Sequence, residues 1–273
     1  MSDPQQPSLA EQADRHWLYQ QSVQDVEAEI DFVTETWDAL RNRPAVFLRE
    51  DFCGTAITAC EWIRRHSEHV AIGVDLDPEV LAWGTKHNLA ELEPSQQERI
   101  ELLRDDVLTT MPGAADIVIA MNFSYFLFRE RQLLRQYFQN VHTGLEDDGV
   151  FFLDAYGGYE APKVLTEPRE YDGFTYIWDQ SSFNPIDSTM TCLIHFEFPD
   201  KSRMDSAFTY EWRLWTLPEI KELLTEVGFA QVDIYWEGTD AETDEGNGVY
   251  RPALVGGADP GWVCYIVAQK QAL

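Results

Sequence analysis

Residues 48–65, LREDFCGTAITACEWIRR, decide the fold, because an apolar run ends there on two acids, turns through CGT and continues as a helix. A strand followed at once by a glycine-containing turn and a helix begins many α/β sheets that bind a ligand at that turn. A turn that binds phosphate needs hydrogen-bond donors and positive charge. Glu50 and Asp51 provide the opposite, so we expect a ligand that carries positive charge.

Strands and helices alternate on both sides of this stretch. Apolar runs buried on both faces and separated by helices predict a parallel sheet with helices on each side. Later strand-like runs with partial alternation predict an antiparallel insertion. We therefore expect an α/β, Rossmann-like fold with a mostly parallel seven-stranded sheet, helices on both faces and an antiparallel β insertion. The seven strands are predicted at 45–50, 69–77, 99–107, 117–123, 149–156, 231–238 and 261–269, and the insertion strands at 174–183, 188–198 and 203–215.

Apolar periodicity and capping residues predict helices before and between these strands. Residues 1–15 read as a mobile tail, and a 3- to 4-residue apolar rhythm predicts one helix over 17–40. Asp77, followed by Pro78, is expected to cap a helix, and Thr216 with Glu219 to form a capping box. The expected segments are 1–40 (tail and cap helix), 41–158 (ligand-binding core), 159–214 (β-rich insertion) and 215–273 (helix and strands that complete the sheet).

The charge balance excludes some partners. The chain has 20 Lys and Arg against 48 Asp and Glu, for a net charge of −28. Such a surface repels phosphate backbones, so nucleic acid and an anionic membrane are both disfavoured as partners. The four cysteines form no C-x-x-C pair and have no histidine at finger-like spacing, so no metal site is expected. No signal peptide and no membrane-length apolar run is present in the sequence, which favours a cytoplasmic protein with reduced thiols.

Polar residues stand where the predicted parallel strands end. In such sheets ligands bind beyond the carboxyl ends of the strands. Glu50, Asp75, Asp106 and Asn122 occupy these positions. Asp75 lies 21 residues after Gly54, a spacing that suits a carboxylate gripping ribose hydroxyls. The Asp106 carboxylate can accept a hydrogen bond from an exocyclic amino group.

The runs EDFCGTA, GVDLD, RDDV and DIVIAMNF, in this order, resemble the motifs of class I S-adenosylmethionine-dependent methyltransferases. The likeness covers about residues 45–160 and resumes at WTLPEIKELLTEVGF, which is similar to the penultimate helix of small-molecule members. It implies an enzyme that binds S-adenosylmethionine and methylates a small-molecule acceptor. The family carries three glycines at alternate positions of the first turn. Here only Gly54 matches, with Phe52 and Ala56 at the other two positions, so we expect cofactor binding through an altered backbone path, with loss of binding as the alternative.

The resemblance also implies individual roles. Glu50 would hold the methionine amino end near the backbone of Cys53 and Gly54, and Asp75 would bind the ribose. The adenine would contact Leu76, Asp106 and the Val107 amide, while Asn122 would lie at the methionine end or the acceptor. The implied cofactor-binding set is Glu50, Cys53, Gly54, Asp75, Leu76, Asp106, Val107 and Asn122, with Tyr19 in the covering segment 16–24.

The insertion, rich in aromatic residues, is the expected wall for the acceptor. Methyl transfer depends mainly on alignment, so no catalytic triad is required. His195 and Asn122 are the candidate catalytic residues, although a lone histidine is more often structural. Candidate acceptor-binding residues are Trp178, Tyr210, Arg213, Tyr250 and Arg251, the last two in a glycine-rich stretch at 244–252 that reads as a closing loop or a flexible hairpin.

Two other functions remain open at the level of sequence. One is an NAD(P)-dependent oxidoreductase on a similar sheet, which the lack of a G-x-G-x-x-G turn disfavours. The other is a non-catalytic S-adenosylmethionine-binding protein, which remains possible because Phe52 and Ala56 replace two of the family's glycines. The sequence leaves the methylated atom (N, O, S or C) and the oligomeric state open.

Overall fold

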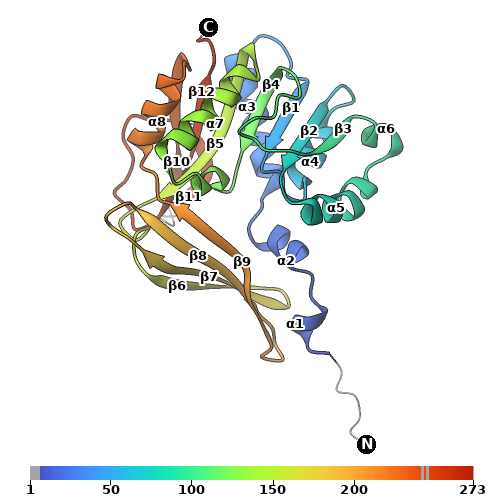
Figure 1. Ribbon diagram of the computed structural model, residues 1–273, viewed down its shortest axis with the longest axis vertical. Helices are drawn as coiled ribbons and strands as arrows, with labels where there is room; N and C mark the ends of the chain where they lie inside the picture. Colours follow the sequence, from blue (N-terminus) through green and yellow to red (C-terminus); the bar gives the residue numbers. More distant parts are fainter. Residues whose placement is uncertain (1–6, 241–242, 244–245, 273) are drawn as a thin grey trace, which may run out of the picture.

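The computed structural model describes residues 7–240, 243 and 246–272, which form two β-sheets (Figure 1). The larger sheet has eight strands in the order β11-β10-β12-β5-β4-β1-β2-β3. Strands β1 to β5 pair in parallel, while β12, β10 and β11 pair antiparallel with their neighbours. The bounds are β1 (Phe47–Asp51), β2 (Val70–Asp75), β3 (Ile100–Arg104), β4 (Ala115–Ala120), β5 (Leu145–Gly157), β10 (Gln231–Thr239), β11 (Gly246–Pro252) and β12 (Trp262–Gln269).

The α/β sheet with an antiparallel insertion is confirmed, with one strand more than the seven expected. The additional strand is β11, which pairs with β10 and comes from the stretch expected to be a loop or a flexible hairpin. Residues 244 and 245 of that stretch lie outside the described residues. The chain runs outward through β1, β2 and β3 and then returns to β4 beside β1. The order of strands therefore reverses between β1 and β4, where open α/β sheets bind ligands.

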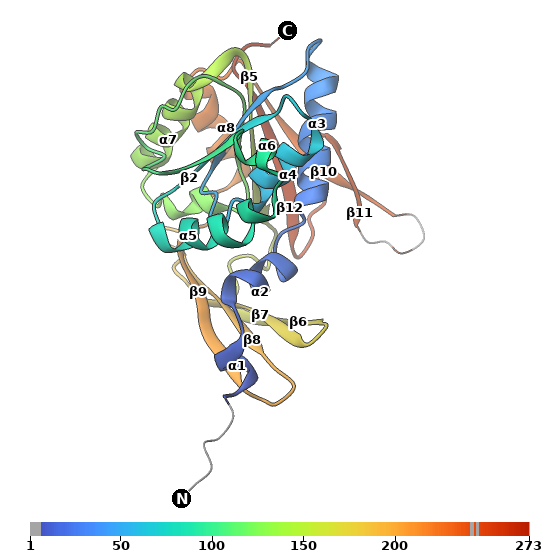
Figure 2. The ribbon, with the colours of Figure 1, turned by 90° about the vertical axis from the view of Figure 1, so that its right-hand side faces the viewer.

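Helices cover both faces of the large sheet, as Figure 2 shows. Helices α7 (Arg131–Thr143) and α8 (Leu217–Glu226) pack on one face, and α3 (Val26–Leu40) and α4 (Ile57–Arg65) on the other. The apolar stripes of these helices bury large side chains against the strands. Among the fully buried residues are Trp37, Trp62, Tyr137, Phe138, Phe151 and Phe152. The remaining helical segments along this part are α5 (Pro78–His87), η1 (Leu89–Glu91), α6 (Pro94–Gln97) and η2 (Ser124–Leu127).

The second sheet is antiparallel, in the order β6-β7-β8-β9, and lies beyond one end of the large sheet (Figure 1). Its strands are β6 (Leu165–Tyr171), β7 (Phe174–Phe183), β8 (Thr189–Glu197) and β9 (Arg203–Arg213). The sequence predicted β7, β8 and β9 but not β6. The missing signal has a physical reason: β6 is an edge strand with mostly exposed residues and a proline, Pro168, which is tolerated only at such an edge.

The N-terminal segment differs from the expectation of a tail and one helix. The predicted helix over 17–40 is two helices, α2 (Arg15–Ser22) and α3, because the chain breaks before Asp25, whose side chain caps α3. Residues 1–6 lie outside the described part. The rest of the expected tail is ordered: it contains α1 (Leu9–Gln12), and the Leu9 and Ala10 amides donate to side chains on the β8–β9 turn. Figure 2 shows α1 and α2 lying along the second sheet.

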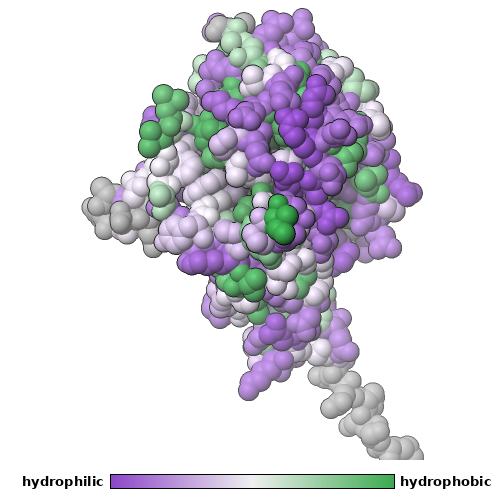
Figure 3. All heavy atoms as spheres, turned by 60° about the vertical axis from the view of Figure 1, so that its left-hand side comes forward, coloured by the Kyte–Doolittle hydropathy of each residue, from purple (hydrophilic) through white to green (hydrophobic). Residues whose placement is uncertain are grey.

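Over the described residues the surface is mainly hydrophilic, and Figure 3 shows apolar residues only in small separate groups on the face in view. None of the described helices combines the length and the apolar character that a membrane crossing requires. All four cysteines are buried free thiols. Within the described chain no cluster of His, Cys, Asp and Glu has the arrangement of a metal site.

Candidate functional site

The turn after β1 has an unusual backbone. Phe52, Gly54 and Ala56 have φ angles of 58°, 52° and 56°, so three alternate residues occupy the left-handed region that favours glycine. Phe52 and Ala56 therefore adopt the conformation that glycines would supply without strain. The Phe52 ring packs against Phe128 and Tyr137, with ring centroids 5.9 and 5.4 Å apart, which offsets part of that strain.

Neighbouring elements hold the turn in place. The Gly54 N–H donates to Oδ2 of Asp75 at 2.9 Å, so the ends of β1 and β2 are tied together. Asp77 caps α5, as expected, and its own N–H donates to Oδ1 of Asp75 at 2.9 Å. Each carboxylate oxygen of Asp75 thus accepts one backbone N–H and retains a lone pair. The Asp75 carboxylate is therefore oriented in advance of any ligand.

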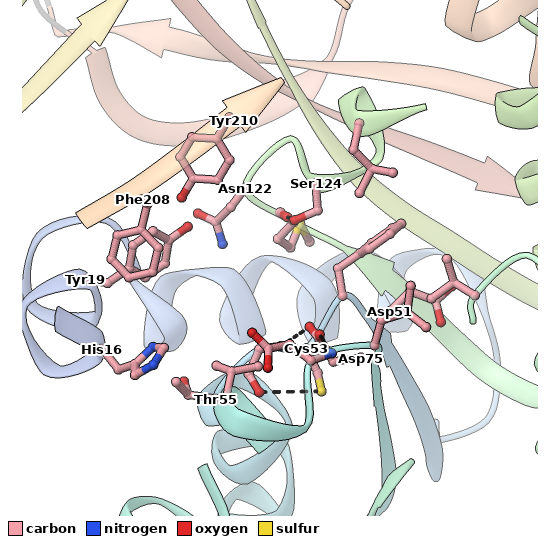
Figure 4. Close-up of a pocket in the computed structure, with 18 of the residues that line it drawn as sticks. His16, Tyr19, Asp51, Cys53, Thr55, Asp75, Asn122, Ser124, Phe208 and Tyr210 are labelled. Carbon is pink, nitrogen blue, oxygen red and sulfur yellow. Dashed lines mark hydrogen bonds between the residues drawn. The ribbon is translucent and has the colours of Figure 1, made fainter. Parts of the chain in front are cut away.

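A cavity of about 790 Å³ opens over the ends of β1, β2 and β4 (Figure 4). Its size is that of a small-molecule or cofactor site. It is closed on its other side by α2 and β9, which contribute Tyr19 and Tyr210. All the residues predicted to bind the cofactor line this one cavity: Glu50, Cys53, Gly54, Asp75, Leu76, Asp106, Val107, Asn122 and Tyr19.

Acids dominate the charge of this cavity. Arg15 is the single Lys or Arg among its lining residues. The acidic lining residues are Glu50, Asp51, Asp75, Asp77, Asp105, Asp106 and Glu211. Leu76 is 62% exposed although apolar, so its side chain offers an open surface in the cavity. The Asp106 carboxylate is fixed by the Leu108 N–H at 2.9 Å.

The two acids at the end of β1 have different environments. Asp51 pairs with the buried guanidinium of Arg49 at 2.8 Å and accepts from the Tyr137 hydroxyl at 2.9 Å. Glu50 accepts the Ala59 N–H at 2.9 Å but has no salt bridge in the described structure. Burial raises the pKa of Glu50 to about 8, and the hydrogen bond from the Ala59 N–H offsets only part of that shift. Glu50 is therefore a carboxyl that a ligand cation would stabilise.

Asp154 on β5 is a buried acid that supports the cavity wall and that the sequence analysis missed. It accepts the N–H groups of Asn122 and Phe123 at 2.7 and 2.8 Å, and both residues have positive φ angles, 58° and 56°. Burial raises the pKa of Asp154 to about 7. Asp154 thereby fixes the loop that carries Asn122 into the cavity. The signal was available, since an acid stands within the otherwise apolar run GVFFLDAY.

A second cavity of about 560 Å³ adjoins the first. The two share Tyr19, Asn122, Tyr210 and Trp212 as lining residues. Of the predicted acceptor-binding residues, Trp178 and Tyr250 line the second cavity, and Tyr210 lines both. In Figure 4, Tyr19, Tyr210 and Asn122 point toward one another at this boundary.

Three predicted residues lie outside the lining of both cavities. His195 is buried on β8, where Nδ1 accepts the Ser206 N–H at 3.0 Å and Nε2 lies 3.4 Å from Asp179. Arg213 pairs with Glu219 at 2.7 Å. Its guanidinium also lies 3.7 Å from the ring centroid of Trp215. Arg251 is exposed on β11. His195 and Arg213 thus have structural partners, and neither they nor Arg251 line the cavities that the other candidate residues share.

Comparison with known proteins identifies the fold. No protein-family model and no curated protein matches the sequence. The chain is similar to the solved structure of an S-adenosylmethionine-dependent methyltransferase from Clostridium acetobutylicum, with 17% identity, 93% of this chain and 96% of that chain covered, and a TM-score of 0.67. It is also similar to an amino pentose methyltransferase from Micromonospora echinaspora, with 15% identity, coverage of 94% and 96%, and a TM-score of 0.65. A sugar N-methyltransferase from Streptoalloteichus gives 14% identity, coverage of 99% and 97%, and a TM-score of 0.62.

Proposed function

We propose that this chain, whose fold is that of the class I S-adenosylmethionine-dependent methyltransferases, binds S-adenosylmethionine in the larger cavity and methylates a small-molecule acceptor held in the smaller one. One observation carries the proposal. Glu50, Asp75 and Asp106, which follow three different strands, converge on one cavity that has few cations of its own. Solved neighbours with this fold include structures bound to S-adenosylmethionine or its demethylated product, which supports the choice of cofactor.

The charges in the cavity fit this cofactor. S-adenosylmethionine carries a sulfonium and an ammonium, both of which carboxylates stabilise. A nicotinamide cofactor would instead bring a pyrophosphate close to Glu50, Asp75 and Asp106, and like charges in a partly buried site repel strongly. The acidic lining therefore disfavours the oxidoreductase alternative.

The residues have distinct proposed roles. Glu50 would hold the methionine ammonium beside the turn at Cys53 and Gly54. Asp75, already oriented by two backbone donors, would accept both ribose hydroxyls. The exposed Leu76 would cover the adenine, and Asp106 with the Val107 amide would bind its Watson–Crick edge.

The bound cofactor would supply a methyl carbon already activated by the neighbouring sulfonium. The task left to the protein is alignment of the acceptor, which for well-held pairs corresponds to effective molarities of roughly 10⁵ M or more. Tyr19, Asn122 and Tyr210, which line both cavities, are placed to orient the acceptor and exclude water. The shared boundary favours a methyltransferase over a non-catalytic binding protein, because a binding protein needs no second chamber.

The cofactor assignment is tested by ligand stabilisation of the purified chain. A ligand that binds the folded state raises the melting temperature. S-adenosylmethionine and S-adenosylhomocysteine should both raise it, and NADH and NADPH should not. Stabilisation by the nicotinamides alone would refute the proposal. Stabilisation by S-adenosylmethionine without methylation of any acceptor in amine, alcohol, phenol and carboxylate libraries would favour the non-catalytic alternative.

The first prediction concerns Asp75. Asp75→Ala removes a charged acceptor, so S-adenosylhomocysteine affinity should fall by about 1–3 kcal/mol in calorimetry. Asp147→Ala, which removes an exposed carboxylate on β5 away from both cavities, is the matched control and should leave affinity unchanged. Because Asp75 also supports the turn, Asp75→Asn is measured in parallel together with the melting temperature of each unliganded variant. Unchanged affinity in a folded Asp75→Ala variant would remove Asp75 from the site.

A further inference from the structure

The smaller cavity has an aromatic lining drawn from elements far apart in the sequence. Its rings include Tyr156 from β5, Trp178 from β7, and Tyr210 and Trp212 from β9. Ring centroids are 4.5 Å apart for Tyr210 and Trp212, 6.0 Å for Trp178 and Trp212, and 6.4 Å for Tyr156 and Trp212. The rings therefore form one continuous cluster around Trp212, where the cavity meets the larger one.

The hydroxyl groups of the two tyrosines are already engaged. The Tyr156 hydroxyl donates to the Met190 sulfur at 3.1 Å, and the Tyr210 hydroxyl is hydrogen-bonded with that of Tyr19. What the tyrosines offer a ligand is therefore mainly their π surface. The negative face of an aromatic ring attracts a cation by about 0.5–2 kcal/mol, more when the pair is desolvated.

The balance of charged residues in the lining also favours a cation. Glu160, Glu167 and Glu237 line the cavity, with Arg169 as the single Lys or Arg among its lining residues. Glu160 pairs with Lys163 at 2.7 Å outside the lining, and Glu237 accepts the Gly248 N–H at 2.8 Å. Glu167 has no salt bridge in the described structure and stands opposite Trp178 in the β6–β7 pairing. A cation that enters thus meets ring faces and carboxylates together.

We infer that the smaller cavity binds the acceptor as an organic ammonium ion of small size, so that the methylated atom is an amine nitrogen. This inference rests on the proposed function for the transfer itself, but its binding part stands on the lining of the smaller cavity. An acceptor carboxylate would meet three glutamates, two of them without a salt bridge among the described residues, against the single guanidinium of Arg169, so the lining disfavours it. A neutral alcohol would gain nothing from the ring faces that a hydrocarbon would not.

The chemistry balances without a further reactant. The ammonium nitrogen loses one proton to water, its lone pair then bonds to the methyl carbon, and the carbon–sulfur electron pair stays on sulfur to give a neutral thioether. The product is a methylated ammonium, whose charge equals that of the acceptor that entered. The aromatic lining therefore suits both acceptor and product.

Three probes of nearly one shape test the binding claim: tetramethylammonium, tert-butanol and pivalate, which are cationic, neutral and anionic. Each is titrated into the protein with S-adenosylhomocysteine present at saturation, so that the acidic larger cavity is filled. We expect tetramethylammonium to bind at least about ten-fold more tightly than tert-butanol, and pivalate most weakly. Equal or tighter binding of tert-butanol or pivalate would overturn the inference.

Variants locate the bound cation. Trp178→Leu and Glu167→Gln should each weaken tetramethylammonium binding several-fold and leave tert-butanol binding nearly unchanged. The matched controls are Trp17→Leu, a half-exposed tryptophan outside both cavities, and Glu170→Gln, which lies on β6 but outside the lining. If the controls weaken tetramethylammonium binding as much as the cavity variants do, the cation binds elsewhere and the inference fails.

Turnover separates this inference from the proposed function. Pairs of small primary amines and the alcohols of the same skeleton are offered with S-adenosylmethionine, and methylated products are detected by mass spectrometry. Methylation of amines alone is the expected result. If S-adenosylhomocysteine binds and only alcohols or carboxylates are methylated, the inference is wrong and the proposed function stands. If S-adenosylhomocysteine fails to stabilise the protein, the proposed function fails. The binding claim is then decided by titrating the three probes into the wild type and the Trp178→Leu and Glu167→Gln variants without S-adenosylhomocysteine, because these variants change the smaller cavity alone.

Discussion

At the scale of one residue, Glu50 is a buried carboxyl that lines the larger cavity and has no cationic partner in the described structure. Asp51, next in the chain, is neutralised by Arg49, whereas Glu50 accepts the Ala59 N–H and has no salt bridge among the described residues. The nearby acids Asp75 and Asp51 raise the pKa of Glu50 further. Burial without a cation leaves such a carboxyl protonated at neutral pH, ready to release its proton when a cation binds.

The second prediction follows from the pKa of Glu50. Its folded-state pKa of about 8 lies above the ordinary value of 4.5, so the folded state holds a proton that the unfolded state releases in this range. The stability that Glu50 contributes is therefore complete below pH 4.5 and is lost as the pH rises toward about 8. Melting temperatures of the unliganded protein measured from about pH 5 to about pH 8 should fall.

Glu50→Gln provides the control for that prediction. Glutamine can still accept the Ala59 N–H but does not titrate, so the variant should show a smaller fall of the melting temperature over the same pH range. The stabilisation by S-adenosylmethionine should increase with pH in the wild type, because the ligand favours the charged carboxylate. An identical pH dependence of wild type and Glu50→Gln would show that Glu50 does not hold its proton in the folded state.

The third prediction compares two fully buried alanines. Ala56 lies in the left-handed region with φ of 56°, whereas Ala59 lies inside α4. Ala56→Gly removes the left-handed strain of a non-glycine residue, roughly 1–2 kcal/mol, and loses the burial of one methyl group, roughly 0.8 kcal/mol. The variant should therefore be neutral or slightly stabilising. Ala59→Gly adds a helix penalty of about 1 kcal/mol to the lost burial and should destabilise by about 2 kcal/mol. Urea unfolding measures both, and equal losses would mean that the turn is not strained at Ala56.

At the scale of elements, local signals were sufficient where the structure is locally determined. Asp77 caps α5, and Thr216 with Glu219 forms the capping box of α8, because a cap depends only on side chains within three or four residues. The strand-end acids were found for a similar reason, since each stands at or close to the end of an apolar run. The geometry that joins Glu50, Asp75 and Asp106 into one site then follows from the parallel sheet.

The elements that sequence reasoning missed depend on partners far along the chain. β6 is polar and carries Pro168, and it is a strand because β7 offers it an edge. The break between α2 and α3 lets the Tyr171 hydroxyl donate to the Ser22 carbonyl at 2.9 Å across 149 residues. His195 was a candidate catalytic residue, but it lies at the β-bulge between Ile194 and Phe196, where contacts with β9 bury it. No pattern within one strand reports such contacts.

The fourth prediction concerns the packing of α5 on the first turn. A Cβ added at Gly84 would lie 2.4 Å from the Thr55 carbonyl oxygen, so Gly84→Ala forces α5 and the turn apart. Overpacking of this kind costs about 1–3 kcal/mol, and the displaced turn should also bind S-adenosylhomocysteine more weakly. Gly261→Ala, whose Cβ would meet nothing within 4 Å, should leave the melting temperature unchanged. A Gly84→Ala variant as stable as Gly261→Ala would show that the helix can move away without loss.

At the scale of the molecule, the site is an interface between the two sheets. The large sheet supplies the acids at the ends of β1 and β2, and β9 with α2 supplies the aromatic residues that face them. Leu18 of α2 is buried with Phe196 and Ala207 of the second sheet, so the N-terminal segment joins that sheet to the core. From α2, the Gln20 amide also donates to the Thr55 hydroxyl at 2.7 Å, which connects it to the first turn. The strands of the mostly parallel sheet were predictable from the sequence, but this enclosure was not, because it depends on contacts between distant segments.

The fifth prediction follows from the net charge of −28. Repulsion among acids destabilises the compact state, whereas surface ion pairs such as Arg43–Asp148 at 2.6 Å and Arg65–Asp31 at 2.9 Å stabilise it. Salt screens both, but the acids exceed the basic residues by 28, so loss of repulsion should dominate. The melting temperature should rise by several degrees between about 0.02 M and about 0.5 M sodium chloride, since about 1 kcal/mol shifts it by roughly 2–4 °C in a large domain. Sucrose at equal osmolality is the control for solute exclusion, and a melting temperature that falls with salt would mean that attractive pairs outweigh the excess of acids.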